Sequence, residues 1–141
     1  MAKRDLHNNI KASRGLSPVA AVTDNTAFVS QILDTQGFQC HEFVGQIGSI
    51  ADADATFVIL VEEGDNSALT DNTAVADADL LGTEAGAAFL FSDDNKTFKI
   101  GYRGSKRYVR VTITPAANTG NIFLAGVWLQ SNPYARLPLS T

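Results

Sequence analysis

Apolar residues recur along the chain in short segments rich in β-branched and aromatic side chains, separated by breaks rich in Gly, Asn and Asp. Such strand-like segments bounded by turn residues are typical of β-structure. No window keeps a 3.6-residue apolar period over three turns, and only a short helical turn is expected, near residues 76–81. The pattern predicts an all-β sandwich or barrel. Six segments are expected to be strands: residues 26–33, 38–47, 56–63, 98–102, 106–114 and 121–130.

The two ends of the chain lack this pattern. Residues 1–17 mix charged residues with Asn, Ser and Gly without a sustained period, so we expect an extended N-terminal arm. A β-sandwich domain then covers residues 18–130. Residues 131–141 contain Pro133 and Pro138, which disfavour a regular helix or strand, and form a second expected arm. Composition alone leaves a frayed tail as an equal alternative for this last segment.

The segment at residues 98–114 has the pattern of a β-hairpin. Gly104-Ser105 would form its two-residue loop, because glycine supplies the positive φ of a type II′ turn. In that register Lys99 lies directly opposite Arg110 on the outer face, and like charges so placed destabilise a sheet. This pairing therefore predicts an acidic neighbour, either on the next strand or on another subunit.

Charge is distributed unevenly. The chain has 11 basic and 15 acidic residues, a formal net charge of −4, but basic residues are concentrated in residues 1–14 and 103–110. Tyr102 and Tyr108, interleaved with these cations, could stack nucleobases. The acidic remainder would nevertheless repel a phosphate backbone within the Debye length of about 8–10 Å. We expect an acidic body with a basic arm and one basic edge, and no direct nucleic-acid binding.

Candidate catalytic and metal-binding groups are few. Cys40 and His41 are adjacent, so on a strand their side chains point to opposite faces and cannot form a thiolate–imidazole pair. Cys40 is expected to be a small buried residue. Two Ala-Asp-Ala-Asp tetrapeptides, at residues 51–54 and 76–79, offer oxygen atoms but lack the glycine and terminal Glu of an EF-hand loop. We expect no catalytic residue, no metal or other cofactor, and hence no enzyme.

The sequence also contains few signals of cellular location. The chain has one cysteine and therefore cannot form an intrachain disulfide. Its first residues lack the apolar run of a signal peptide, and no apolar stretch approaches the roughly 20 residues of a membrane helix. These observations predict synthesis in a reducing cytoplasm and no membrane contact.

Three blocks of sequence resemble a known family. They are VGQIGSIADADATFVILVEEGDN, AVADADLLGTE and IGYRGSKRYVRVTITP, which follow one another within about residues 43–115. In order and spacing they resemble the capsid decoration, or cement, proteins of tailed bacteriophages. The resemblance implies a jelly-roll-like antiparallel β-sandwich, made in the host bacterial cytoplasm, that binds the outer surface of an icosahedral head. It also implies homodimers near two-fold axes that bridge major capsid protein subunits and stabilise the shell, with no catalytic residues.

The arms and the expected hairpin supply the candidate contacts with a capsid protein or a neighbouring subunit. The candidate partner-binding residues are Lys3, Arg4, Lys11, Arg14, Lys99, Tyr108, Arg110, Tyr134, Arg136 and Leu137. The alternative function is a carbohydrate-binding jelly-roll module on a phage particle, with or without calcium, in which Tyr102, Tyr108 and Trp128 contact sugar. Trp128 lies in an apolar segment and is expected in the core, which disfavours this alternative.

Overall fold

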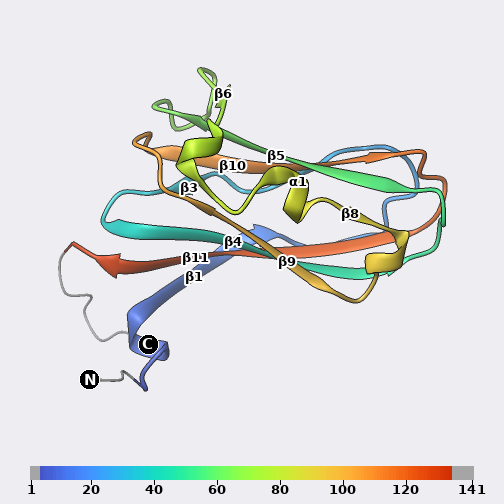
Figure 1. The fold of residues 1–141 in the computed structure, drawn as a ribbon, viewed down its shortest axis with the longest axis horizontal. Helices are drawn as coiled ribbons and strands as arrows, with labels where there is room; N and C mark the ends of the chain where they lie inside the picture. Colours follow the sequence, from blue (N-terminus) through green and yellow to red (C-terminus); the bar gives the residue numbers. More distant parts are fainter. Residues whose placement is uncertain (1–3, 135–141) are drawn as a thin grey trace.

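The fold is a jelly-roll-like sandwich of two antiparallel β-sheets, as predicted (Figure 1). The structure is a computed structural model that describes residues 4–134. Sheet A has the strand order β1-β11-β4-β9-β7, and sheet B has the order β2-β10-β5-β6, with β3 added to β10 and β8 added to β5. The strands are β1 (Ile10–Leu16), β2 (Phe28–Val29), β3 (Leu33–Asp34), β4 (Phe38–Ile50), β5 (Thr56–Gly64), β6 (Thr73–Ala74), β7 (Leu80–Leu81), β8 (Phe89–Leu90), β9 (Thr97–Tyr102), β10 (Tyr108–Ala116) and β11 (Ile122–Pro133).

Short helical turns connect some of these strands. They are the 3₁₀ helices η1 (His7–Asn9), η2 (Asp77–Asp79) and η3 (Phe91–Asp93) and the single-turn helix α1 (Glu84–Ala87). The turn expected near residues 76–81 is η2. The Thr83 side chain begins α1 by accepting a hydrogen bond from the backbone N–H of Gly86 at 2.9 Å, as N-cap residues do.

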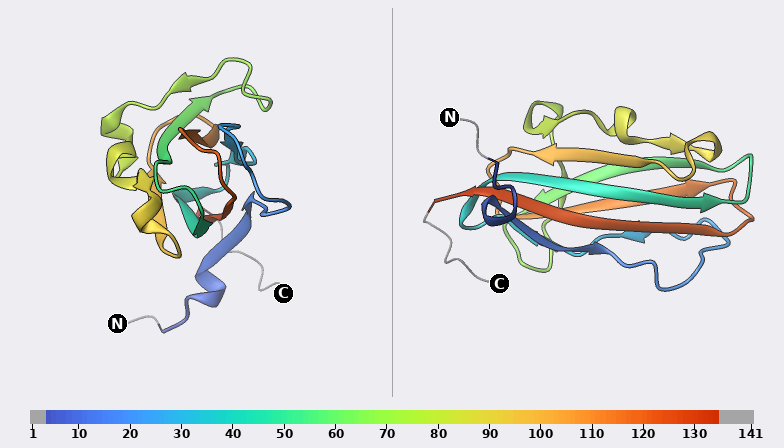
Figure 2. Two further views of the ribbon diagram at one scale, coloured as in Figure 1. Left: turned by 90° about the vertical axis from the view of Figure 1, so that its right-hand side faces the viewer. Right: turned by 90° about the horizontal axis from the view of Figure 1, so that it is seen from below.

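The two sheets face each other when seen along the strands (Figure 2, left), and the buried apolar side chains of the core lie between them. Alternate residues of each long strand point inward, as a period of two requires. Sheet A contributes Phe43, Ile47, Ile100, Leu124 and Trp128, and sheet B contributes Phe57, Ile59, Val61, Val109, Val111 and Ile113. The apolar alternation in the sequence thus identified the buried residues Ile100 of β9 and Val109, Val111 and Ile113 of β10.

The aromatic part of the core packs onto glycine backbone. A Cβ atom at Gly126 of β11 would lie 2.4 Å from Cζ of Phe43, and one at Gly15 of β1 would lie 2.7 Å from Cε2 of the same ring. Phe43 also meets Trp128 edge to face, with ring centroids 5.0 Å apart. These glycines leave the space in which the Phe43 ring sits.

The expected hairpin is wrong. β9 pairs with β4 and β7 in sheet A, whereas β10 pairs with β5 in sheet B, so residues 103–107 cross from one sheet to the other. The reason is that the apolar faces of β9 and β10 are buried equally well when the two strands face each other across the core. Tyr102 fixes the crossing: its hydroxyl donates to Glu63 Oε2 at 2.5 Å and accepts the backbone N–H of Lys106 at 2.9 Å.

The segment at residues 26–33 divides into β2 and β3. Gln31 leaves sheet B and connects to sheet A, since its N–H donates to the Gly15 carbonyl at 2.9 Å. Its own carbonyl accepts the Trp128 Nε1–H at 3.0 Å. The hydrogen bonds of the Gln31 N–H and carbonyl to sheet A thus interrupt a strand that the apolar pattern predicts as continuous.

The structure also places strands within the stretches expected to be arms. β1, inside residues 1–17, pairs antiparallel with β11 along its length, and β11 continues to Pro133. β1 is an edge strand that lies partly beyond the core, so its exposed positions carry Lys11 and Arg14 and the apolar alternation is lost. The end of β11 and the beginning of β1 lie at the same end of the sandwich (Figure 1); this is called the arm end below.

Candidate interaction surfaces

The basic stretch at residues 103–110 is largely neutralised within the chain. Nε and Nη2 of Arg107 donate to the two carboxylate oxygens of Asp34 at 3.0 and 2.9 Å. Nζ of Lys106 pairs with Asp65 at 2.6 Å. The Arg107 hydrogen bond holds the pKa of Asp34 below its ordinary value. These residues therefore tie three loops together at the arm end and do not form a free cationic rim.

Arg110 has its acidic neighbour on the next strand. It lies opposite Glu62 of β5, and its Nη2 and Nε donate to Glu62 Oε2 at 2.7 and 3.1 Å. Lys99 is not opposite Arg110, because it lies on sheet A beside Val44. Arg110 and Tyr108 lie on sheet B, so these two candidates and Lys99 are on opposite sides of the sandwich. The predicted need for an acidic neighbour is confirmed, and the predicted pairing is wrong.

Arg110→Ala is expected to lower the free energy of unfolding by about 1–3 kcal/mol, because it leaves a largely buried carboxylate without its cation. The Glu62 side chain is only 13% exposed. Urea denaturation followed by circular dichroism measures the change. The double variant Glu62→Gln, Arg110→Ala should lose less than the sum of the two single variants. A loss below about 0.5 kcal/mol for Arg110→Ala would show that the pair contributes nothing.

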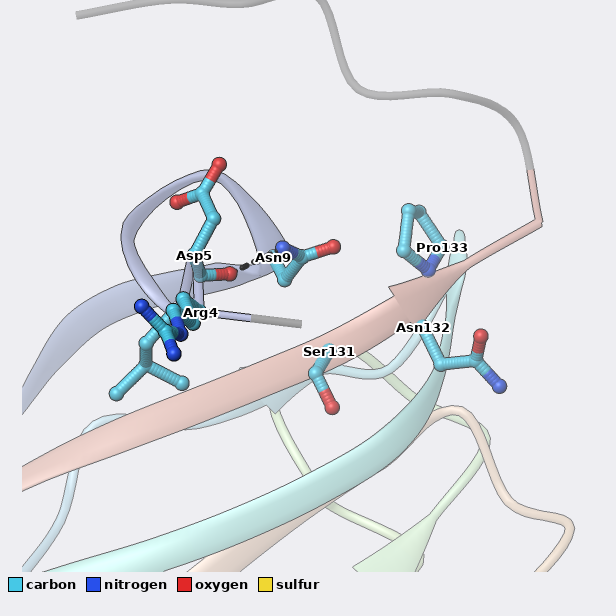
Figure 3. A pocket seen from close by; sticks show the side chains of 7 residues that line it. Arg4, Asp5, Asn9, Ser131, Asn132 and Pro133 are labelled. Carbon is cyan, nitrogen blue, oxygen red and sulfur yellow. Dashed lines mark hydrogen bonds between the residues drawn. The ribbon is translucent and has the colours of Figure 1, made fainter. Parts of the chain in front are cut away.

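A groove joins the two described chain ends at the arm end (Figure 3). The beginning of the chain forms one wall, and the end of β11 forms the other. Its lining residues are Arg4, Asp5, Leu6, Asn9, Ser131, Asn132 and Pro133. The wall at η1 is held by Asn8, whose N–H and Nδ2 donate to the Asp5 carboxylate at 3.0 and 2.7 Å and lower the pKa of Asp5. Both arms therefore enter or leave the sandwich beside one groove.

A second hollow lies next to it, between residues 35–39 and 103–107. His41 lines it and is buried, which lowers the pKa of its imidazole. Tyr134 lies at its border, 74% exposed, with its backbone N–H donating to the Gly37 carbonyl at 3.0 Å. The hollow contains no paired nucleophile and base. The Tyr134 side chain therefore borders the hollow without filling it.

Cys40 is exposed and His41 is buried, so the expectation that Cys40 is buried is wrong. The cause is an irregular start of β4, where Phe38 and His41 are both buried although three positions apart. Gln130 Nε2 lies 3.3 Å from His41 Nδ1 and donates to the Asp34 carbonyl at 3.0 Å. This hydrogen-bonded network draws His41 inward and turns Cys40 outward.

Of the remaining candidate residues, Arg4 and Tyr134 lie at the arm end, whereas Arg14 lies on the outer side of sheet A. Lys11 points past the edge of the core, with its Nζ 5.6 Å from the centroid of the Phe38 ring. Lys3, Arg136 and Leu137 lie outside the described residues.

The outer side of sheet A carries a surface that sequence reasoning missed. Strand register aligns Arg14, Val127, Val44 and Lys99 in one row across four strands, and aligns Leu129, Glu42, Gly101 and Leu81 in the neighbouring row. These eight residues are called the A face. Val127 and Leu81 are 42% and 48% exposed. The only sequence signal for the A face was the alternation of outward-pointing residues along β4 and β11. The strand order of sheet A was needed to show which of these residues lie side by side.

The outer side of sheet B has a different character. Its register places Val29, Thr112 and Leu60 in one row and Thr114 and Val58 in the next. These five residues are called the B face. The B face is uncharged, and the neighbouring Arg110 is already paired with Glu62.

The acidic tetrapeptides serve as turn residues. Asp52 accepts hydrogen bonds from the N–H and hydroxyl of Thr119, both at 2.8 Å, and from the N–H of Asp54. These bonds lower the pKa of Asp52. The second tetrapeptide contains η2. Within residues 4–134 no three His, Cys, Asp or Glu side chains are grouped to hold a metal ion, and no helix of that range is long and apolar enough to span a membrane.

The aromatic residues on which the carbohydrate alternative depends are mostly internal. Trp128 and Tyr102 are 1% and 2% exposed. Tyr108 is half-buried, with the Arg107 guanidinium 5.2 Å from its ring centroid. The prediction that Trp128 lies in the core is confirmed, and these three side chains form no exposed platform for a sugar ring.

Solved structures of similar fold come from phage proteins and carbohydrate-binding modules. The PBSX exported protein XepA has a TM-score of 0.58 at 14% identity, covering 93% of this chain and 40% of XepA. A capsid chain of Ralstonia phage GP4 has a TM-score of 0.49 at 11% identity, covering 95% of this chain and 91% of that one. The xylan-binding CBM22-1 domain of Paenibacillus barcinonensis Xyn10C has a TM-score of 0.45 at 10% identity, covering 92% and 89%. What they share with this chain is the fold. No protein-family model and no curated protein matches the sequence.

Proposed function

We propose that this chain is a virion structural protein, a capsid decoration protein that binds the outer surface of an icosahedral phage head. It bridges major capsid protein subunits, stabilises the shell and catalyses no reaction. In its specific form the proposal is a protein like the cement protein of a short-tailed Bordetella phage, acting as a homodimer near two-fold axes. The resemblance of residues 43–115 supports this family, and a phage protein shares the fold.

The observation that carries the proposal is the groove at the arm end. Arg4 and Ser131–Pro133 line one groove, so the first and last described residues of the chain lie at the same end of the sandwich and present one surface to a partner. Arg4 and Tyr134 are exposed there. An end at which two chain segments offer contacts suits attachment to a lattice, because two linked contacts on one support bind more tightly than either does alone.

Stabilisation of the shell then follows from repetition. Each copy adds its interface to a lattice that presents the same surface many times, and each first contact raises the effective concentration of the second. No chemistry is required of the protein. Its contribution is a sandwich stiff enough to keep the two attachment points at a fixed separation.

Removal of residues 1–9, which precede β1, is expected to weaken binding to heads at least about tenfold, because one of two linked contacts is lost. Heads from phage lacking this gene are mixed with the intact chain or the shortened chain, and bound protein is quantified after sedimentation. Asp54→Asn, at the opposite end of the sandwich, serves as the matched control and should bind like the intact chain.

The outcomes separate the proposals. Equal occupancy by the shortened chain would reject the arm contact. Failure of the intact chain to bind heads would reject the capsid function itself. Binding of the free chain to a glycan array, with or without calcium, would support the carbohydrate-binding alternative in its place.

A further inference from the structure

The two outer sides of the sandwich differ in how their charges are satisfied. On sheet B, Arg110 is paired with Glu62 and the B face is uncharged. On sheet A, three charged residues share a face with aliphatic side chains. None of the four ion pairs formed among residues 4–134 includes Arg14, Glu42 or Lys99. Sheet A is therefore the side with charges left to be matched by a partner.

Arg14 and Lys99 stand at the two ends of one row. Val127 and Val44 separate them in the strand register, and three strand spacings of about 4.8 Å place the two Cα atoms about 14 Å apart. Two exposed cations thus flank an aliphatic strip of fixed width. A complementary surface would carry two carboxylates at that separation with aliphatic side chains between them.

Glu42 lies near the centre of the same face. Its carboxylate rests over Gly101 and against Leu81: a Cβ atom at Gly101 would lie 2.6 Å from Glu42 Oε2 and 2.8 Å from the Leu81 Cβ. Burial raises the pKa of Glu42, and Lys99 opposes that shift only in part. A half-buried carboxylate gains more from an incoming cation than a fully hydrated one does. The A face thus favours a basic side chain on the partner, opposite Glu42.

The A face is continuous with the arm groove. Strand β11 contributes Ser131–Pro133 to the groove and Val127 and Leu129 to the A face, so it belongs to both surfaces. Strand dimensions give the eight residues of the A face about 260 Å², below the roughly 800 Å² per partner of a stable interface. The face is thus too small to hold a stable dimer alone, and a partner that also contacts the arms supplies the missing area. A two-fold axis through its centre would also set Glu42 against its own copy.

We propose that the A face lies against the shell protein, on an aliphatic surface with a basic side chain opposite Glu42 and carboxylates about 14 Å apart opposite Arg14 and Lys99. This inference rests on the proposed function, which names a capsid protein as partner without assigning a side of the sandwich. It leaves the B face turned away from that contact.

Val127→Asp on the A face and Val58→Asp on the B face form a matched pair for the test. Both valines are exposed on the outer side of a sheet, 42% and 59% respectively, so both variants should fold, which circular dichroism checks. Gene-deleted heads are titrated with each variant. Val127→Asp is expected to weaken binding at least tenfold, about 1.4 kcal/mol, and Val58→Asp to change it less than about twofold.

Glu42→Gln adds a readout that a structural role would not produce. It should weaken binding to heads several-fold, because the partner cation loses its carboxylate. It should also raise the midpoint of thermal unfolding of the free chain, because folding no longer keeps an ionised group half-buried. Opposite signs for binding and stability support the inference, whereas unchanged binding by Glu42→Gln overturns it.

The other outcomes are equally decisive. If Val58→Asp weakens binding as much as Val127→Asp, or more, the A-face assignment is overturned. If Val127→Asp leaves binding to heads unchanged and instead dissociates a dimer of the free chain in sedimentation, the face joins two copies and the proposal fails. If the intact chain does not bind heads, the capsid function fails first, and the intact-chain titration shows this separately.

Discussion

Trp128→Ala is expected to lower the free energy of unfolding by about 3–5 kcal/mol, the cost of removing a large aromatic side chain from a core. Trp128 is 1% exposed and meets Phe43 edge to face at 5.0 Å. Its Nε1–H also donates to the Gln31 carbonyl at 3.0 Å, so the variant loses both packing and a bond between the sheets. Urea denaturation followed by far-UV circular dichroism measures the loss.

Trp128→Phe is the matched control for this prediction. It keeps an aromatic ring in the core but removes the donor to Gln31, and a loss of about 1–2 kcal/mol is expected from the unpaired carbonyl and the smaller volume. Equal losses for the two variants would show that the ring itself contributes little. A loss below about 1 kcal/mol for Trp128→Ala would contradict its placement in the core.

Gly126→Val is expected to destabilise the protein by about 2–3 kcal/mol through overpacking. Even the first carbon of the new side chain would lie 2.4 Å from Cζ of Phe43. The ring cannot move aside freely, because Trp128 and Phe98 pack against it with centroids at 5.0 and 6.1 Å. The same denaturation measurement applies.

The second variant in this series removes the obstructing ring. Phe43→Leu combined with Gly126→Val should cost less than the sum of the two single changes, since leucine removes the ring that valine would meet and valine fills space that leucine leaves empty. Strict additivity would show that Phe43 and Gly126 do not share the space that the structure assigns to them.

The sequence predicted strands better than it predicted their partners. A period of two identifies which residues of β9 and β10 are buried, but it is equally satisfied by a hairpin and by two strands facing each other across a core. Gly104-Ser105 fits the local rule for a two-residue loop, and only the global packing of Tyr102 against Glu63 decides for a crossing. Pairing depends on contacts between residues distant along the chain, which local patterns do not contain.

The interaction surfaces show the same limit. Arg14 and Lys99 were both expected to contact a partner, yet their shared row exists only because β11 and β4 lie between β1 and β9. Arg110 has the same charge and was grouped with Lys99, but Glu62 on the adjacent strand neutralises it. Residue type alone therefore suggested which side chains contact a partner, whereas strand order determined which of these charges are left without an ion pair within the described residues.

The position of β11 has a consequence for how this protein is made. β1 and β4 do not pair with each other; each is hydrogen-bonded to β11, which follows them in the chain. During translation β4 can pair with β9 as soon as residues 97–102 are available, but β1 must wait for its partner until residues 122–133 have left the ribosome. Sheet A is therefore completed only when β11 has been synthesised, whereas every strand of sheet B precedes β11 in the chain.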